Sequence, residues 1–257
     1  MKFNSIWIAS IPRTGSMWTT NIIREIFLEG NLNVFPKDVI QYDKEILNYF
    51  NSTAQLDDNI LNKYVLKIHS KLTVLPPRSK IITNIRNPYD ICASHNEFMK
   101  CDLNKSILVA SDLSNWVNYY KNLYNNIFSV KYEDIENEPN VLINKLTNFC
   151  EINLSELQIE NISLNFSKNK ILKLIKSNDE EIQKKINRNE EIDQKKIVRF
   201  KNGSYRSFDI NTGFQTGHIS TRKSGEWRKF FSTEETDIII DKLDSIAVEL
   251  GYQSEKN

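Results

Sequence analysis

The loop over residues 11–18 has the residue types that bind a phosphate or sulfate group. It reads Ile-Pro-Arg-Thr-Gly-Ser-Met-Trp and lies between an apolar run and a stretch with helical spacing of apolar side chains. Backbone N–H groups and the positive end of the dipole at a helix N-terminus attract anions. Arg13 adds a fixed charge, Thr14 and Ser16 add hydroxyl donors, and Gly15 permits a close approach of the backbone. Taken alone, the pattern is equally compatible with an ordinary connection, because the Gly-Lys pair of a Walker A loop is missing.

A second candidate anion site begins at Arg86, where an apolar run ends. Asn87 followed by Pro88 is typical of a helix start. Ser94 would then lie two turns into that helix, so Arg86 and Ser94 could hold one phosphate at the carboxyl end of a strand. The structural alternative is an ion pair between Arg86 and Asp90 beside a buried serine.

The elements that must position these two candidate sites are predicted strands and helices that alternate along the chain. The apolar runs predict strands over residues 3–10, 64–69, 80–86 and 127–132. Helical spacing and capping residues predict helices over residues 18–30, 113–124, 139–149 and 234–250, and a further helix that starts at Pro88. Strands that are apolar throughout and alternate with helices indicate a parallel sheet covered on both faces. We therefore expect an α/β fold, with one domain over residues 1–257.

The composition excludes several classes of protein. The 257 residues include 34 Lys and Arg against 33 Asp and Glu, a net charge of +1, so a protein that coats nucleic acid is not expected. No apolar run is long enough to span a bilayer, which predicts a cytoplasmic protein without a membrane partner. The three cysteines lack metal-ligand spacing, so neither a disulfide framework nor a metal site is expected.

Together the two anion motifs resemble those of the sulfotransferase family that uses 3′-phosphoadenosine 5′-phosphosulfate (PAPS). Residues 11–18 resemble the family's 5′-phosphosulfate loop, and Arg86 with Ser94 resembles its 3′-phosphate motif. The resemblance implies a P-loop nucleotide-kinase-like sulfotransferase fold. It also implies PAPS as cosubstrate, the adenosine bisphosphate PAP as product, and no metal.

The resemblance extends to a candidate general base, His69. Residues 64–69 are similar to a family strand that ends Lys-Thr-His, whose histidine takes a proton from the acceptor. Residues two apart on a strand face the same side, so Lys67 and His69 should project together toward the carboxyl edge of the sheet. An imidazole is well matched to taking a proton near neutral pH. We expect His69, Arg13 and Lys67 to be catalytic.

Further resemblances suggest the rest of the nucleotide site. Tyr132 and Trp18 match residues that contact the adenine, whereas Phe166 is a weaker match and is equally compatible with a core position. Residues 222–227 resemble a late basic motif, but the pattern is two residues shorter, so the residue that meets the 3′-phosphate stays open. The residues expected to bind the cofactor are Arg13, Thr14, Gly15, Ser16, Met17, Trp18, Arg86, Ser94, Tyr132, Phe166, Arg222, Lys223 and Ser224.

One departure from the family pattern concerns Arg13, where the family usually has lysine. Arginine stays charged, so we expect Arg13 to act as an electrostatic clamp on the sulfuryl oxygens. A nucleotide-dependent kinase is the alternative enzyme class, although no magnesium carboxylate is evident at a strand end. A non-catalytic nucleotide-binding module is the third possibility.

The acceptor is the least defined part of the expectation. Tyr42, Tyr49 and three aspartates at positions 43, 57 and 58 favour a polar or cationic small molecule. The short loop around Arg13 is more similar to bacterial members, which suggests natural-product sulfation. The polar residues 167–221 are expected to form either a solvated helix or a mobile lid. A monomer and a homodimer are both compatible with the sequence.

Overall fold

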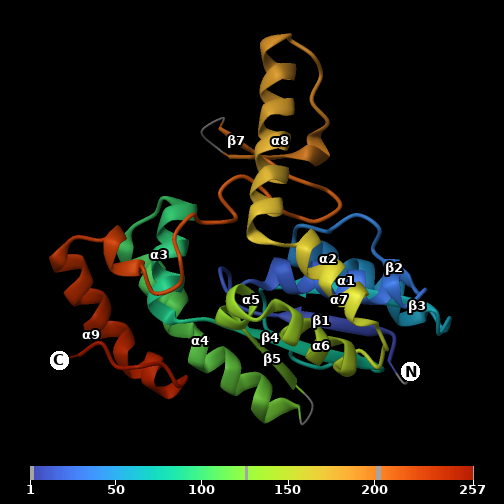
Figure 1. The fold of residues 1–257 in the computed structure, drawn as a ribbon, viewed down its shortest axis with the longest axis horizontal. Coiled ribbons are helices and arrows are strands. Elements are labelled where there is room, and N and C mark those ends of the chain that lie inside the picture. Colours follow the sequence, from blue (N-terminus) through green and yellow to red (C-terminus); the bar gives the residue numbers. More distant parts are fainter. Residues whose placement is uncertain (1–2, 125–126, 201–203, 257) are drawn as a thin grey trace.

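The sheet that carries the predicted motifs has five strands, all parallel. The computed structural model describes residues 3–124, 127–200 and 204–256. The strand order is β2-β3-β1-β4-β5, so the first predicted strand lies in the centre (Figure 1). The strands are β1 (Ser5–Ala9), β2 (Asn33–Phe35), β3 (Asn62–Ile68), β4 (Ser79–Ile85) and β5 (Ile127–Lys131). All four predicted strands are present, and β2 is an additional short edge strand.

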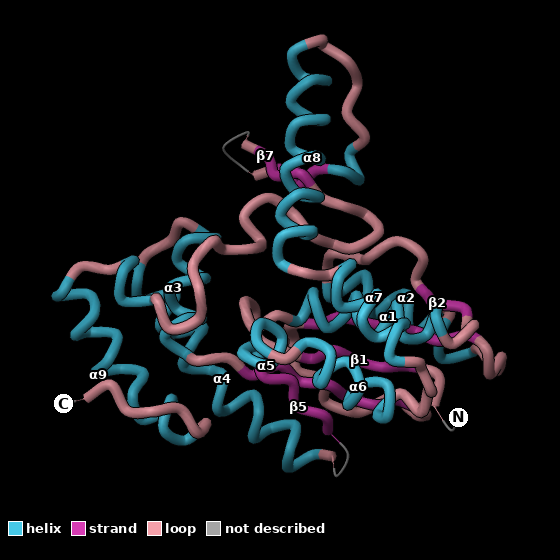
Figure 2. Tube along the Cα trace, viewed as in Figure 1, coloured by secondary structure: helices cyan, strands magenta, loops and turns pink. Residues whose placement is uncertain are grey.

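Helices cover both faces of this sheet, as predicted (Figure 2). Successive residues of β1 point to opposite faces: Trp7 packs into one apolar cluster and Ile6 into the other. The Trp7 cluster includes α2 (Asp43–Ser52), α3 (Pro88–Met99), α4 (Leu103–Leu123) and α9 (Thr233–Glu249). The Ile6 cluster includes α1 (Ser16–Glu29), α6 (Pro139–Phe149), α7 (Glu156–Asn165) and the start of α8 (Lys168–Asn187).

Capping residues set where several helices begin. The Asn87 side chain accepts a hydrogen bond from the Tyr89 N–H, and Pro88 is the first residue of α3, as predicted. The predicted start of α4 was wrong, because this helix begins at Leu103. Asp102 caps it by accepting from the Asn104 N–H. Its first two turns include the polar residues 104–106, which weaken the helical pattern of apolar residues in the sequence.

The polar segment after Ser167 leaves the sheet and returns to its carboxyl edge. Helix α8 projects away from the sheet, and the antiparallel pair β6 (Ile197–Arg199) and β7 (Tyr205–Ser207) lies beside it (Figure 1). Residues 208–224 then run back toward α3. The polar segment therefore includes a helix, which was one of the two expectations for residues 167–221. The other expectation, a mobile lid, stays a prediction. None of the helices in the described ranges is long and apolar enough to cross a membrane.

Candidate active site

The carboxyl ends of β1, β3, β4 and β5 open into one large cavity of about 1160 Å³. Almost all residues singled out in the sequence line it. They are Arg13, Gly15, Ser16, Met17, Trp18, Lys67, His69, Arg86, Ser94, Tyr132, Phe166, Lys223 and Ser224. Thr14 and Arg222 are not among the lining residues. The cavity thus brings together side chains from strand ends that are far apart in the sequence.

Close packing against the side chains of Ile135 and Tyr132 restricts the conformation of the loop that follows β1. Gly15 precedes α1 with a φ of 89°, in the left-handed region that favours glycine. A Cβ at this position would lie 2.9 Å from side-chain atoms of Ile135 and Tyr132, so only glycine fits. Thr14 is fully buried, and its hydroxyl donates to the Ile11 carbonyl at 2.9 Å. Thr14 therefore fastens the loop, while Ser16 and Arg13 line the cavity.

Arg86 is a buried cation with a nitrogen that has no partner. One terminal nitrogen donates to the Arg13 carbonyl at 3.0 Å, and the guanidinium lies 3.8 Å from the centre of the Tyr132 ring. Its Nε is buried and makes no hydrogen bond. The alternative ion pair with Asp90 does not occur; Asp90 accepts from the Gly225 N–H at 2.8 Å. A buried, unpaired donor on a cation is costly, and an anion in the cavity would satisfy it.

Lys67 and His69 project together, and they contact one another. Lys67 Nζ lies 3.0 Å from His69 Nε2, and His69 Nδ1 lies 2.6 Å from the Ser10 carbonyl oxygen. A carbonyl only accepts, so the ring proton is on Nδ1 and Nε2 accepts from Lys67. Burial, followed by the charge of Lys67, lowers the pKa of His69 to about 3. Burial also lowers the pKa of Lys67 to about 8. His69 is therefore a neutral imidazole at neutral pH.

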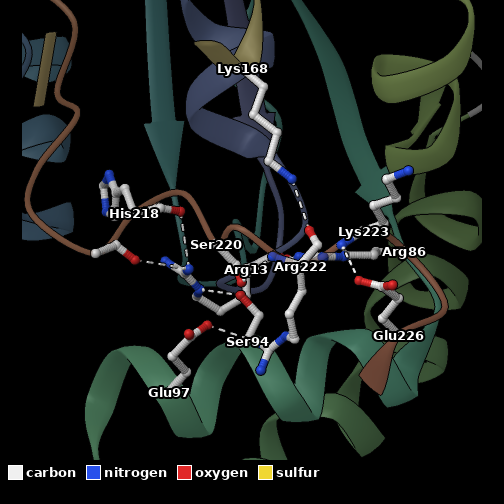
Figure 3. A network of polar contacts seen from close by, with 11 residues as sticks. Arg13, Arg86, Ser94, Glu97, Lys168, His218, Ser220, Arg222, Lys223 and Glu226 are labelled. Carbon is white, nitrogen blue, oxygen red and sulfur yellow. Dashed lines mark hydrogen bonds and ion pairs between the residues drawn. The ribbon is translucent and has the colours of Figure 1, made fainter. Parts of the chain in front are cut away.

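Arg222 turns away from the cavity. Its guanidinium pairs with Glu97 at 2.9 Å (Figure 3). It also lies over the Phe230 ring. Ser224 donates to Glu136 at 2.5 Å and lines the cavity, as does Lys223. The motif therefore presents Lys223 and Ser224 to the cavity, whereas Arg222 reaches α3.

Three further lining residues, which the sequence motifs did not indicate, complete the site. Lys168 begins α8 and donates to the Arg222 carbonyl at 2.8 Å (Figure 3). Its ammonium also lies 3.7 Å from Glu136. Phe98 and His218 both contact Arg13, Phe98 through its ring and His218 through its carbonyl. With His95 and His69, His218 places all three histidines of the chain in the cavity lining. Burial lowers the pKa of His218 well below its usual value.

The charge of the cavity is strongly one-sided. Within the described residues, Arg13, Lys67 and Arg86 form no ion pair with a carboxylate, and Glu136 is the carboxylate of the lining. Clustered cations raise the local concentration of an anionic ligand. The described ranges also contain no group of three His, Cys, Asp or Glu residues that could hold a metal ion. The arrangement is thus suited to an anion with several negative charges.

Comparisons with known proteins identify the family of the chain. A family model for the sulfotransferase domain matches residues 3–212. The fold is similar to retinol dehydratase crystallised with androsterone and the inactive cofactor PAP, with a TM-score of 0.59, 15% identity, and coverage of 98% of this chain and 82% of that one. Mouse sulfotransferase SULT7A1 complexed with PAP gives a TM-score of 0.60, 16% identity, and coverage of 95% and 85%.

At such low identity these structural likenesses concern the fold, which is that of a sulfotransferase. The family match is independent of them and includes the residue 11–18 loop, Lys67, His69, Arg86 and Ser94. Because it extends over most of the sequence, the chain belongs to the sulfotransferase family.

Proposed function

We propose that the protein transfers the sulfuryl group of PAPS to a hydroxyl or amine of a small-molecule acceptor. The observation that carries this proposal is the meeting of Arg13, Lys67 and Arg86 with a neutral His69 in one cavity. These cations lack carboxylate partners among the described residues, which is what a ligand with about four negative charges requires. The imidazole beside them is neutral, but burial and the charge of Lys67 make it a weak base, with a pKa of about 3, as long as Lys67 contacts its Nε2.

The residues present fit a bound adenosine bisphosphate. The loop at residues 13–17 would hold the 5′-phosphosulfate with backbone N–H groups and Arg13. Arg86, through its unpartnered Nε, would hold the 3′-phosphate with Ser94 and Lys223. The expected adenine contacts lie together, because Trp18 Nε1 donates to the Phe166 carbonyl at 3.1 Å. Structural neighbours of this fold were crystallised with PAP, which supports PAP as a ligand.

His69 and Lys67 have different roles in the reaction: His69 takes the proton of the acceptor, and Lys67 contacts the sulfuryl oxygens. PAPS, when bound, supplies the sulfuryl group that the acceptor oxygen or nitrogen attacks. Lys67 now donates to His69 Nε2, the atom that must take the acceptor's proton. Sulfuryl oxygens offer the Lys67 ammonium a second partner, and a move toward them would free Nε2. The Ser10 carbonyl accepts a hydrogen bond from the Nδ1–H of His69. This bond keeps the proton on Nδ1 and leaves Nε2 as the atom that can act as a base.

The remaining lining favours an acceptor with an uncharged, apolar body. Large, mainly apolar side chains are among the residues that line the cavity, namely Tyr42, Phe98, Met99, Phe208, Phe214 and Ile219. The three aspartates that suggested a cationic acceptor have other partners. Asp43 accepts from the His69 N–H, Asp57 from the Tyr64 hydroxyl, and Asp58 from Arg78. Androsterone and retinol, found in the retinol dehydratase structures, have bodies of this kind. Bacterial natural-product sulfation and a cytoplasmic location stay predictions.

Binding calorimetry tests the donor and the alternative kinase function together. We expect PAP to bind at least 100-fold more tightly than ATP with Mg²⁺, because Arg86 and Lys223 suit a 3′-phosphate. Replacing Arg86 with Met should weaken PAP binding about 100-fold through loss of charged hydrogen bonds.

The matched control for Arg86 is Arg78→Met, which removes a surface arginine paired with Asp58 at 3.0 Å. PAP affinity should not change in this variant. A preference for ATP, or unchanged PAP binding in Arg86→Met, would contradict the proposal. A non-catalytic module would bind PAP normally but would add no sulfonate to any acceptor by mass spectrometry.

The pH dependence follows from the two lowered pKa values. With the pKa of His69 at about 3, the base is already neutral above pH 4, so kcat/KM should show no acid limb down to pH 5. With the pKa of Lys67 at about 8, its charge is lost above that pH. We expect kcat/KM to fall about tenfold per pH unit above 8. Lys67→Arg should move this alkaline limb upward, because arginine stays charged. An acid limb near the usual histidine pKa of 6.5 would contradict a neutral His69.

A further inference from the structure

The Arg13 side chain is held by neutral groups from two other parts of the chain. Its Nε donates to Ser94 Oγ at 3.0 Å, on α3. One terminal nitrogen donates to the carbonyls of His218 at 3.1 Å and Gly217 at 3.4 Å (Figure 3). Its Cζ lies over the Phe98 ring, 4.3 Å from the ring centre. Hydrogen bonds therefore hold two of its nitrogens, and the Phe98 ring packs against the guanidinium. The other terminal nitrogen has no partner among the described residues.

The Phe98 ring is also contacted by groups other than Arg13. A second guanidinium, that of Arg206 on β7, lies over the same ring at 3.8 Å, and Arg206 also donates to the Phe98 carbonyl. The His218 ring is 5.2 Å from the Phe98 ring. A Cβ at Gly217 would lie 3.4 Å from Phe98, so this turn packs directly on it. Phe98 thereby connects the residue 11–18 loop, α3 and the returning polar segment.

The electrostatics explain why such a support is needed. Arg13 lies near Arg86, and burial followed by the Arg86 charge lowers the pKa of Arg13 to about 9. No carboxylate pairs with Arg13 among the described residues, so repulsion from Arg86 would push a free guanidinium away. An aromatic face and carbonyl oxygens attract a cation without neutralising it. Such partners leave the full charge available to an anion.

We infer that Phe98 is a positioning residue, which together with the turn at Gly217 and His218 orients Arg13 toward the sulfuryl group. The inference rests on the proposed function. It concerns features of this chain: the family usually has lysine at the position of Arg13, and the turn lies beyond residue 212, where the family match ends. A lysine has no planar face to lie against the Phe98 ring and no fork to reach two carbonyls.

A double-mutant cycle in kcat tests this role. Phe98→Leu keeps an apolar side chain but removes the ring, and we expect kcat to fall about tenfold while the PAP dissociation constant changes less than twofold. Phe98→Tyr restores a ring face and should return kcat to within about threefold of the wild type. In an Arg13→Lys background, Phe98→Leu should cost less than about twofold, because the group it orients is gone.

The matched control is Phe149→Leu, which removes a ring that lies 5.0 Å from a different cation, Lys80, away from the cavity. Its kcat should equal that of the wild type. Equal losses from Phe98→Leu in the wild-type and Arg13→Lys backgrounds, or no loss at all, would overturn the positioning role. Failure of the wild type to bind PAP in calorimetry would instead contradict the proposed function, so the two failures are distinguishable.

Discussion

Replacing His69 with Ala is expected to lower kcat for sulfuryl transfer by about 10³-fold, the typical contribution of a general base. The variant loses the Nε2 atom that would take the acceptor's proton. PAP affinity should stay within about twofold, because Arg86, Lys223 and the residue 11–18 loop are untouched. Single-turnover assays with PAPS, read by the mass of the sulfonated acceptor, measure the loss, and calorimetry with PAP measures the binding.

His95→Ala is the matched control for this experiment. His95 also lines the cavity, but its Nδ1 lies 3.0 Å from Ser106 Oγ. We expect its removal to lower kcat less than tenfold. A His69→Ala variant that keeps a tenth or more of the wild-type turnover would show that another group takes the proton.

The central part of the fold was predictable because its signals are local. A buried parallel strand is apolar along its length, and Asn87 with Pro88 caps and starts a helix without help from distant residues. Elements that depend on tertiary packing were missed. Strand β2 has only three residues and pairs with β3 alone, and α7 has just two buried side chains, Ile159 and Ile162. Neither leaves a clear periodic pattern in the sequence.

The residues of the candidate site also divide into those that local sequence patterns indicate and those that depend on tertiary packing. The residue 11–18 loop and the Arg86 motif were visible because the contacting residues are contiguous or two helical turns apart. The direction of Arg222 was not visible, since it depends on Glu97, which lies 125 positions earlier in the chain. Phe98 and the turn at Gly217 could be assigned only after the polar segment was seen to return to the cavity. The cavity lining at Phe208, Phe214 and Ile219 likewise comes from this returning segment.

The position of the cations explains how one cavity can serve both binding and transfer. Arg86 is fixed on a strand end against Tyr132, where an anion would gain a permanent partner. Lys67 already has an alternative partner in His69, so it can leave one contact for another as charge moves. Arg13 combines both properties. Its side chain is held in place, as that of Arg86 is, but one of its terminal nitrogens has no partner among the described residues and can contact a new group. We therefore expect Arg13 to contact the charge that develops during transfer.

Replacing Arg13 with Ala is accordingly expected to lower kcat by about 10²- to 10³-fold, the cost of removing one preorganised donor to developing negative charge. PAP affinity should fall only about tenfold, since the backbone N–H groups of the loop and Arg86 remain. Arg13→Lys should lose about tenfold in kcat, because it keeps a positive charge without the planar fork that the Phe98 ring and two carbonyls hold.

Arg24→Ala is the control, since Arg24 also donates to two backbone carbonyls, those of Pro36 and Lys37, but lies outside the cavity lining. Its kcat should be unchanged. The ratio between binding and turnover decides the role of Arg13. If Arg13→Ala loses PAP affinity and kcat/KM by the same factor with kcat intact, Arg13 contributes only to ground-state binding and the clamp on the sulfuryl group is wrong. A loss confined mainly to kcat requires that Arg13 contacts charge that is present only during transfer, which is the consequence of holding a guanidinium in place before the reaction begins.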